Sequence, residues 1–397
     1  APWLTVIGLG EDGPAGLSEA SRSALERAEI VMGPPRHLGM LDGMDLRAEP
    51  VAWPVPFSDG IPVLLGYRGR PVAVLASGDP VWFGAGASLI RHVPAAEMRV
   101  YPGASTFALI AARMGWALED THCAGLHAQP LALLLPHLAA RRRMIVYLRD
   151  GPAVADLGAY LAGNGWGETH LSVFEAVGGP RERRTEARAT EPGGPYAHPV
   201  AVAFEVDGEG PALPLASGRP DAWFDHDGQL TKRPVRALTL SALAPQPFEH
   251  LWDIGSGSGS VAIEWLLADR SLRASAVERH PERARRISAN AARFGVEDRL
   301  NLVEGEAPGA LTDLPSPAAV FVGGGLDLTL LDRLCTLPPG TRLVANAVTL
   351  ESEALLAEAH AARGGTLLRV NLAEAASLGQ KRGWQAAYPI TQWSTSL

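Results

Sequence analysis

The C-terminal half contains a set of residues whose types and spacing suit a ligand-binding turn. The set consists of Asp253, Gly255, Gly257 and Gly259. The apolar run 248–254 predicts a buried strand, and 260–268 predicts a helix that begins directly after the glycines. Glycines at alternate positions let the backbone pass close beneath a ligand, and the following helix points its first N–H groups at it. The sequence therefore predicts a cofactor loop here.

The chemistry of the ligand depends on the residues around the glycines. The dinucleotide fingerprint G-x-G-x-x-G needs a glycine at its sixth position, where this chain has Ser260. An acid at the strand end would repel a pyrophosphate but would suit a positively charged ligand. The spacing D-x-G-x-G-x-G resembles the first motif of class I S-adenosylmethionine (SAM) methyltransferases, whose cofactor carries an ammonium and a sulfonium. A glycine-rich turn without a ligand is the alternative interpretation.

Two more strand ends extend this resemblance. A predicted strand over 274–278 ends in Glu278, about twenty residues after the glycines, where an acid would bind the ribose hydroxyls. Another predicted strand over 300–303 leads to Glu306 and Ala307, where the adenine edge would lie. Three strand ends would thus meet in one crevice.

Residues on both sides of the glycine turn are candidates for contacting the cofactor or a substrate. Thr231 is placed to contact SAM, and Lys232 and Arg233 follow it just before a predicted helix over 234–244. Solvated surface charge is the alternative for these two cations. Gly323 and Gly324 follow a predicted strand over 318–322, and glycines there would let a large flat molecule approach the sheet. The candidate substrate contacts of this half are therefore Lys232, Arg233, Gly323 and Gly324.

Further elements must hold this crevice in place. Predicted strands over 341–345, 367–372 and 385–390 bring the total to seven, with predicted helices over 281–294, 328–334 and 351–363. The arginines of 281–294 are interpreted as a solvated face. This pattern indicates a Rossmann-like α/β fold with seven strands.

The N-terminal half repeats one plan of strand, sharp polar turn and helix. Predicted strands over 3–10, 71–76 and 98–101 each run into a turn containing glycine, and strands become more frequent after 171. Such repetition predicts an α/β fold of two subdomains, with the loops gathered at one sheet edge. The glycines after the first strand look like a phosphate-binding loop, but no Gly-Lys-Ser/Thr follows.

Three motifs of this half carry a second resemblance. Val-Ile-Gly-Leu-Gly (6–10), Ser-Gly-Asp-Pro (77–80) and Pro-Gly-Ala-Ser-Thr (102–106) resemble the class III tetrapyrrole methyltransferases over residues 1 to about 206. That family holds SAM in a cleft between two α/β domains, and its first glycine loop faces the macrocycle. The resemblance implies that Gly10 contacts the substrate. It also implies a cofactor site at Gly78, Asp79, Ser105 and Thr106.

Composition limits the alternatives. The 397 residues carry a net charge of −8, which argues against a nucleic-acid partner. Cys123 has His122 and His127 nearby but no further ligand at metal spacing, so no metal site is expected.

With no membrane-length apolar run and no basic leader before the first strand, we expect a cytoplasmic protein that does not bind membranes. A Gly- and Pro-rich linker over 207–219 is predicted to separate domains 1–206 and 220–397.

Together, the two halves resemble the fused precorrin-6Y methyltransferases (decarboxylating) of cobalamin synthesis. The resemblance implies two SAM sites, a corrinoid substrate methylated at ring carbons 5 and 15, and loss of carbon dioxide from the acetate on ring carbon 12. Carbon 5 would belong to the N-terminal domain, and carbon 15 with the decarboxylation to the C-terminal one. No catalytic side chain is assigned, and a homo-oligomer is expected. Another tetrapyrrole substrate, an NAD-linked oxidoreductase, and methylation of RNA or protein are the alternatives.

Overall fold

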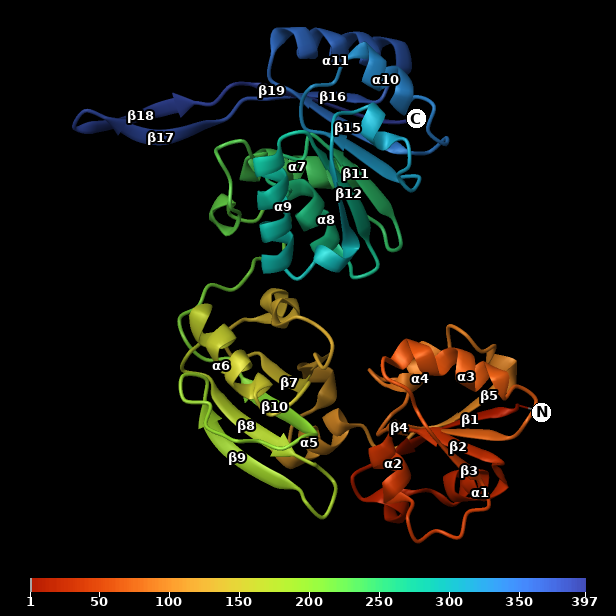
Figure 1. Ribbon diagram of the computed structural model, residues 1–397. Helices are drawn as coiled ribbons and strands as arrows, with labels where there is room; N and C mark the ends of the chain where they lie inside the picture. Colours follow the sequence, from red (N-terminus) through yellow and green to blue (C-terminus); the bar gives the residue numbers. More distant parts are fainter. Residues whose placement is uncertain (1) are drawn as a thin grey trace. The chain divides into compact units, whose positions relative to one another are not determined.

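The computed structural model describes residues 2–397, which form two compact units. One unit comprises residues up to Leu131 together with His137–Ala212, and the other comprises Ala132–Pro136 and Leu213–Leu397. Figure 1 shows that each unit is built from layers of helices and strands. Each unit has its own sheets and apolar clusters, as expected for a folded domain.

The first sheet of the N-terminal unit has five parallel strands in the order β3-β2-β4-β1-β5. Its strands are β1 (Leu4–Leu9), β2 (Ile30–Gly33), β3 (Glu49–Ala52), β4 (Val72–Ser77) and β5 (Met98–Tyr101). Its helices are α1 (Glu19–Arg27), α2 (Pro35–Met40), α3 (Gly60–Gly66) and α4 (Ala85–Leu89). Apolar clusters lie on both faces, so β1 and β4 are buried throughout most of their length. Ser18 caps α1, because its Oγ accepts from Ser21 N at 3.1 Å.

The second sheet of this unit is mixed, in the order β6-β7-β10-β8-β9, and only β6 and β7 pair in parallel. Its strands are β6 (Thr121–Gly125), β7 (Arg143–Leu148), β8 (His170–Glu175), β9 (Arg183–Arg188) and β10 (Val200–Glu205). Two helices accompany it, α5 (Thr106–Met114) and α6 (Ala153–Gly163). The two-subdomain α/β fold expected for residues 1–206 is therefore confirmed.

The C-terminal unit contains a seven-stranded sheet in the order β13-β12-β11-β14-β15-β19-β16. Its strands are β11 (His250–Ile254), β12 (Arg273–Glu278), β13 (Leu300–Glu304), β14 (Ala319–Val322), β15 (Arg342–Ala347), β16 (Thr366–Val370) and β19 (Ile390–Ser396). Only β19 runs antiparallel to its neighbours. The expected Rossmann-like fold is confirmed, and the strand order reverses at β11, where ligands bind in such sheets.

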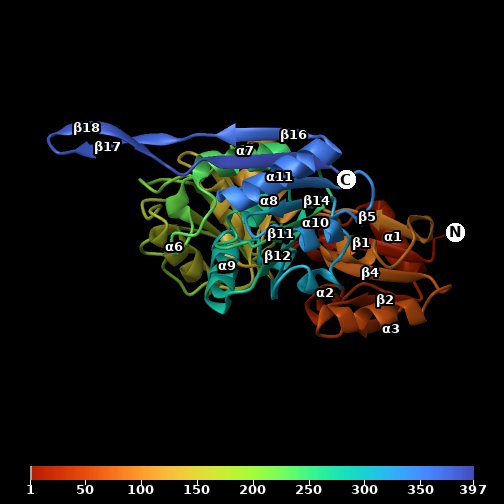
Figure 2. The same cartoon turned by 90° about the horizontal axis from the view of Figure 1, so that it is seen from above.

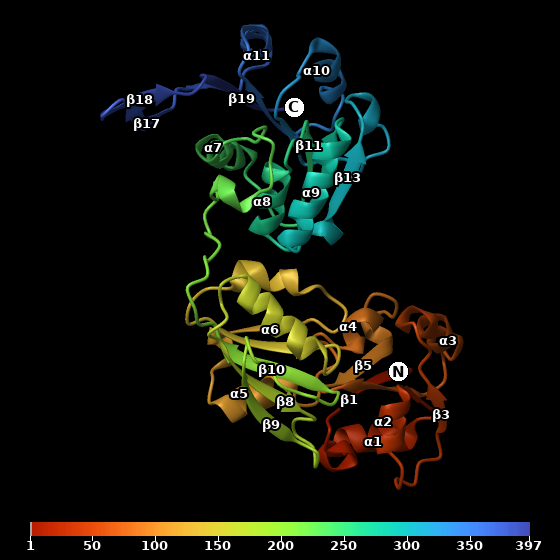
Figure 3. The same cartoon turned by 60° about the vertical axis from the view of Figure 1, so that its left-hand side comes forward.

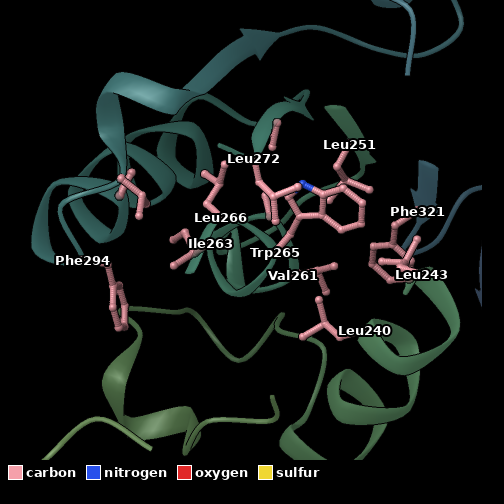
Figure 4. Packing of buried hydrophobic residues seen from close by; sticks show 14 of the residues in the cluster. Leu240, Leu243, Leu251, Val261, Ile263, Trp265, Leu266, Leu272, Phe294 and Phe321 are labelled. Atoms are coloured by element: carbon pink, nitrogen blue, oxygen red, sulfur yellow. The ribbon is translucent and has the colours of Figure 1, made fainter. Parts of the chain in front are cut away.

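Helices cover both faces of this sheet. They are α7 (Arg233–Leu243), α8 (Ser260–Ala268), α9 (Pro281–Arg293), α10 (Leu328–Leu334) and α11 (Leu350–Arg363). Figure 3 shows α8 and α9 side by side, and Figure 4 shows Leu240 and Leu243 of α7 close to Val261 of α8. A second apolar cluster joins α10 and α11 to the opposite face. Short 3₁₀ turns complete the chain at Gly13–Gly16, Phe57–Asp59, Ala95–Glu97, Leu118–Asp120, Leu131–His137, Asp221–Trp223, Glu297–Arg299 and Gly309–Leu311.

The prediction of a seventh strand over 385–390 is wrong. Residues up to Ala386 belong instead to a two-stranded hairpin, β17 (Ala373–Leu378) and β18 (Lys381–Ala386), which extends away from the main sheet in Figure 1 and Figure 2. The seventh strand is β19, where Trp393 is completely buried between the apolar side chains of β15, β16 and α11. Burial of this single tryptophan places β19 inside the sheet.

Candidate active sites

The glycine loop after β11 has the backbone geometry that only glycine adopts readily. Gly255, Gly257 and Gly259 have φ angles of +68°, +63° and +79°. The Gly255 and Ser256 amides donate to the Val277 carbonyl at 2.9 and 3.1 Å, which ties the loop to the end of β12. These contacts hold the loop across the carboxyl ends of β11 and β12. The three predicted glycines therefore form a turn that a ligand can approach closely.

Asp253 lies under this loop and is completely buried. Its Oδ2 accepts from Ser256 Oγ at 2.7 Å and from Ala262 N at 3.1 Å, whereas Oδ1 has no partner. Burial raises the pKa of this carboxyl to about 6, in spite of these two donors. The carboxylate connects the loop to the first turn of α8. Asp253 would therefore influence a cofactor by fixing the loop and by its negative charge.

Two backbone amides fix the Glu278 carboxylate at the end of β12 in a position where it can accept from ligand hydroxyls. Its Oε2 accepts from Gly257 N at 2.9 Å and its Oε1 from His280 N at 3.0 Å. A carboxylate oxygen can accept two hydrogen bonds, so each oxygen keeps one lone pair for a ligand. The side chain is almost fully buried, so little water competes there. This arrangement fits a ribose diol bound next to the glycine loop.

Replacing Glu278 by glutamine is expected to weaken SAM binding at the C-terminal site by roughly tenfold or more. The amide nitrogen cannot accept, so either the Gly257 or the His280 amide would lose its partner. Calorimetry on the full chain should show the weakened affinity. Glu282→Gln on the exposed surface of α9 is the control. Unchanged affinity together with a lower melting temperature would show that Glu278 is only structural.

Gly323 and Gly324 form the opposite side of the loop. The Gly323 amide donates to the Ile254 carbonyl at 3.1 Å, and a Cβ on Gly323 would lie 3.2 Å from the Gly255 carbonyl oxygen. Gly324 has open space around its Cα. The triple-glycine turn after β14 is thus adjacent to the glycine loop. A side chain on Gly323 would press against the Gly255 carbonyl, so glycine keeps the two turns close together.

Glu306 and Ala307 follow β13, next to the end of β12. Gly305 N donates to the Glu278 carbonyl at 3.0 Å, which joins the two strand ends. The Glu306 side chain is exposed and forms an ion pair with Arg279 at 3.1 Å. Ala307 is half-buried against the apolar cluster of β11 and β14. Both residues therefore lie at the predicted adenine end of the crevice.

The segment before α7 lies over the glycine loop. A Cβ on Gly257 would lie 3.0 Å from the Gln229 carbonyl oxygen, two residues before Thr231. Lys232 and Arg233 are exposed, and neither forms an ion pair within residues 2–397. These two side chains are therefore free to meet an acidic substrate.

A buried ion network holds this segment. Arg236 and Glu264 are both completely buried, and Arg236 Nε donates to Glu264 Oε1 at 2.7 Å. Arg236 also donates to the carbonyls of Thr231 and Arg219. Glu264 accepts in addition from Gly218 N at 2.8 Å and from Arg219 N at 2.9 Å. This ion pair thus connects α8 to the chain on both sides of residues 220–231, the covering segment that lies over the glycine loop.

The interpretation of the α9 arginines as a solvated face is wrong for three of them. Arg283 and Arg286 form ion pairs with Asp227 at 2.9 and 3.2 Å, and Arg293 donates to the Trp223 carbonyl at 2.7 Å. Hydrogen bonding to Arg283 lowers the pKa of Asp227 to about 2. Asn290 adds bonds to the Asp225 amide and carbonyl. The arginines fix the covering segment, which the sequence could not show because their partners lie some sixty residues earlier.

Three glycine turns meet at the carboxyl edge of the first N-terminal sheet. Gly78 N donates to the Leu9 carbonyl and Gly103 N to the Gly78 carbonyl, both at 3.0 Å. Gly78 has a φ of +53°, and a Cβ on Gly8 would collide with the Gly78 carbonyl and the Gly103 amide. The ends of β1, β4 and β5 therefore approach one another at backbone distance, which places their loops in one cluster.

Two adjoining cavities open beside these turns, with volumes of about 1020 and 410 Å³ including the space at their mouths. Asp79 and Ser105 line the larger one, Gly10 and Gly78 the smaller, and Thr106 both. Asp79 Oδ1 accepts from Val81 N at 3.0 Å, so it caps a turn, and Ser105 Oγ accepts from Ala108 N to cap α5. The structure brings together all five residues predicted for this half.

Aromatic residues make the larger cavity suitable for a flat apolar ring system. Trp53, Phe57, Trp82, Phe83 and Phe107 line it. Trp82 and Phe83 remain more than 40% exposed, so they present apolar surface to the cavity. Sequence analysis assigned none of these residues. Their clustering depends on loops that are distant in sequence.

Arg36, Tyr147 and His198 are further lining residues that the sequence did not reveal. Arg36 stands in a Gly-Pro-Pro-Arg-His stretch that predicts only the end of a strand. Tyr147 lies within β7, where its burial raises the pKa of the hydroxyl. The only hint in the sequence was the polar hydroxyl of Tyr147 among the apolar residues 144–146 and Leu148 of β7.

Comparisons with known proteins match both halves. A family of tetrapyrrole (corrin/porphyrin) methylases matches residues 4–192, and a precorrin methyltransferase domain matches residues 222–397. A precorrin-6Y C(5,15)-methyltransferase (decarboxylating) of Sinorhizobium sp is 47% identical over 99% of this chain and 96% of its own. The chain belongs to this precorrin-6Y methyltransferase family. A relative of the same name from Mycobacterium tuberculosis is 41% identical over 99% of both chains.

Among solved structures, the C-terminal domain of a precorrin-6Y C5,15-methyltransferase from Rhodobacter capsulatus is 53% identical, with a TM-score of 0.46. It covers 47% of this chain and 100% of that chain. The family matches and the full-length relatives confirm the resemblance of both halves to precorrin-6Y methyltransferases that the motifs predicted. Within residues 2–397, no helix is long and apolar enough to span a membrane, and no group of three or more His, Cys, Asp or Glu side chains could hold a metal ion.

Proposed function

We propose that this chain transfers methyl groups from SAM to ring carbons 5 and 15 of precorrin-6Y and releases carbon dioxide from the acetate on ring carbon 12, giving precorrin-8. The observation that carries the proposal is the full-length similarity to relatives named for both methylations and for the decarboxylation. An NAD-linked oxidoreductase is disfavoured, because Ser260 replaces the last glycine of the dinucleotide fingerprint.

The two units supply the two cofactor sites of this proposal. In the N-terminal unit the site is Gly78, Asp79, Ser105 and Thr106, and in the C-terminal unit it is Thr231, Asp253, Gly255, Gly257, Gly259, Glu278, Glu306 and Ala307. The buried carboxylate of Glu278 beside the glycine loop fits a cofactor with hydroxyl groups and positive charge. The cofactor supplies the methyl group when bound.

The protein's part in methylation is to orient and enclose the reactants. A reduced tetrapyrrole supplies its own carbon nucleophile, so transfer requires an in-line approach to the methyl group more than a catalytic side chain. The glycine turns at 255–259 and 323–325 leave room for a ring system to reach the sheet edge. Gly10 offers the corresponding approach beside the N-terminal cavity.

Decarboxylation breaks the bond between the acetate methylene and its carboxylate, and the electron pair passes into the conjugated macrocycle while carbon dioxide leaves. Uptake of one proton from solvent then converts the methylene into a methyl group on ring carbon 12. The chain must hold the other carboxylates of the substrate during this step, which Lys232 and Arg233 do in this proposal.

Replacing both Lys232 and Arg233 by alanine is expected to lower kcat/KM for carbon-15 methylation and for decarboxylation together, by roughly tenfold or more, because both steps need the same bound polyanion. Carbon-5 methylation should persist, since it belongs to the other unit. Mass spectrometry of the products distinguishes the two outcomes.

The matched control replaces two exposed arginines of the same unit, Arg270 and Arg285, by alanine. It removes the same charge but should leave both activities unchanged. Loss of carbon-5 methylation alone in the Lys232/Arg233 variant would mean that the two units have been assigned the wrong way round.

The remaining parts of the proposal concern organisation. We propose domains over 1–206 and 220–397 joined by a linker over 207–219, a cytoplasmic enzyme without a nucleic-acid partner, and a homo-oligomer. The oligomer is supported by the hairpin β17–β18, which pairs with no other strand in residues 2–397 and exposes Leu378, Trp384 and nearby Tyr388. An isolated hairpin is marginally stable in water, so a second copy would stabilise it.

A further inference from the structure

One charged residue stands out in the smaller cavity of the N-terminal unit. Arg36, near the start of α2, is the one permanent cation among the described residues that line the two adjoining cavities. The acids that line them are Glu11 and Asp79. In a chain with a net charge of −8, a cation beside the proposed macrocycle site calls for a functional explanation.

Two neighbours fix the guanidinium of Arg36. Nη1 forms an ion pair with Glu11, and Nη2 donates to His37 Nε2 at 3.0 Å. His37 is buried and its Nε2 also lies 3.1 Å from Ser77 Oγ. Burial lowers the pKa of His37 to about 4, with a further contribution from Arg36, so the ring is neutral at pH 7 and can accept. The guanidinium is therefore oriented before any ligand arrives.

The guanidinium retains unused donors. It has five N–H groups, of which these contacts occupy two. The Arg36 side chain is 31% exposed, whereas that of Glu11 is 11% exposed. Since Glu11 is also paired with Arg181 at 3.4 Å, the three charges sum to +1. An incoming carboxylate would thus find a positive site, and Glu11 would keep a partner.

The charge of Arg36 also acts on the groups around the larger cavity. After burial, it is the next cause of the lowered pKa of His198, and it opposes the effect of burial on Tyr147. Tyr147 lines both cavities, so the field of Arg36 reaches the place where they adjoin. Ser77 and Thr106 also line both cavities, so a macrocycle bound through Arg36 in the smaller cavity can extend past them into the larger one.

We propose that Arg36 binds a side-chain carboxylate of the tetrapyrrole in the N-terminal cleft, with Glu11 and His37 as its positioning residues. This inference rests on the proposed function, because it takes the substrate to be a polycarboxylate macrocycle. A guanidinium matches a carboxylate with two parallel hydrogen bonds, which fixes the orientation of the ring as well as its affinity.

The test uses Arg36→Ala and Arg36→Lys in the full chain. The alanine variant should raise KM of the corrinoid for carbon-5 methylation by about tenfold or more, with a smaller change in kcat. The lysine variant keeps the positive charge but loses the two parallel N–H donors of the guanidinium, so its KM should lie between those of the native chain and the alanine variant. SAM affinity and carbon-15 methylation should be unchanged. Arg70→Ala, which removes an exposed pair with Glu29 in the same unit, is the control.

Salt dependence separates binding from a structural role. The KM of the native chain should rise with ionic strength, and this slope should be smaller in Arg36→Ala, because one charge pair with the substrate is missing. An unchanged KM in a folded Arg36→Ala chain would overturn the inference, as would an equal loss of SAM affinity. If the native chain bound no corrinoid at all, the proposed function would fail first, and this inference with it.

Discussion

Replacing Glu264 by alanine is expected to destabilise the C-terminal unit by about 3–5 kcal/mol, because the change leaves the buried Arg219 without an anion and the buried Arg236 with only Asp221. Arg236 would lose its 2.7 Å partner while its side chain stays completely buried. Two backbone amides, of Gly218 and Arg219, would also lose their acceptor. Since this network holds the segment over the glycine loop, carbon-15 methylation and decarboxylation should fall as well.

Hydrogen exchange followed by mass spectrometry can measure this effect in each unit separately, which a single melting curve of a two-unit chain cannot do. Peptides from β11 and β12 should exchange faster, and peptides from β7 and β10 should not change. Glu282→Ala, which removes an exposed pair with Arg285, should alter stability by less than about 0.5 kcal/mol. A similarly small effect for Glu264→Ala would show that the buried pair does not hold the unit together.

Replacing Gly8 by alanine is expected to lower carbon-5 methylation by about 100-fold, because no space for a Cβ exists between the ends of β1, β4 and β5. The new methyl group would meet the Gly78 carbonyl and the Gly103 amide, which are backbone atoms and cannot rotate away. The strand ends would have to separate, and displacement of a reacting site by about 1 Å can cost two orders of magnitude in rate. SAM affinity of the N-terminal site should fall in parallel.

Carbon-15 methylation in the same sample provides the internal reference for this variant. Gly163→Ala at the end of α6 is the matched control, because no atom lies within 4 Å of its added Cβ. That change should be neutral or slightly stabilising. Native carbon-5 activity in Gly8→Ala would mean that the three turns need not lie as close together as they do here.

Local patterns were sufficient to predict most of the fold. Strand β5 and helices α8 and α10 begin and end where their patterns predict, because apolar periodicity and a turn residue coincide at their ends. Strand β9 escaped prediction because Arg183–Arg188 contains no apolar alternation. It is held by pairing with β8 and by bonds such as that between Ser172 and Glu186 at 2.8 Å. Long-range partners of this kind have no signal in a local pattern.

The candidate sites divide in the same way. Gly255, Gly257 and Glu278 could be selected from their spacing, because a loop and a strand end determine where they lie. The burial of Asp253 beneath the loop could not be predicted, because it depends on how α8 packs over this side chain. Arg36 is a similar case. The proposed role of Arg36 depends on its ion pair with Glu11 and on a cavity lined by segments that are distant in the sequence.

The near absence of lysine gives this chain an unusual chemical property. All but two of its 35 basic residues are arginines, and the two lysines, Lys232 and Lys381, are both exposed. An amine-selective reagent can therefore modify only these two side chains besides the chain's amino terminus. Lys232 directly precedes α7, whereas Lys381 lies at the tip of the β17–β18 hairpin. Amine-selective labelling followed by peptide mass spectrometry would therefore report on the solvent exposure of just these two positions besides the amino terminus, without any engineered attachment site.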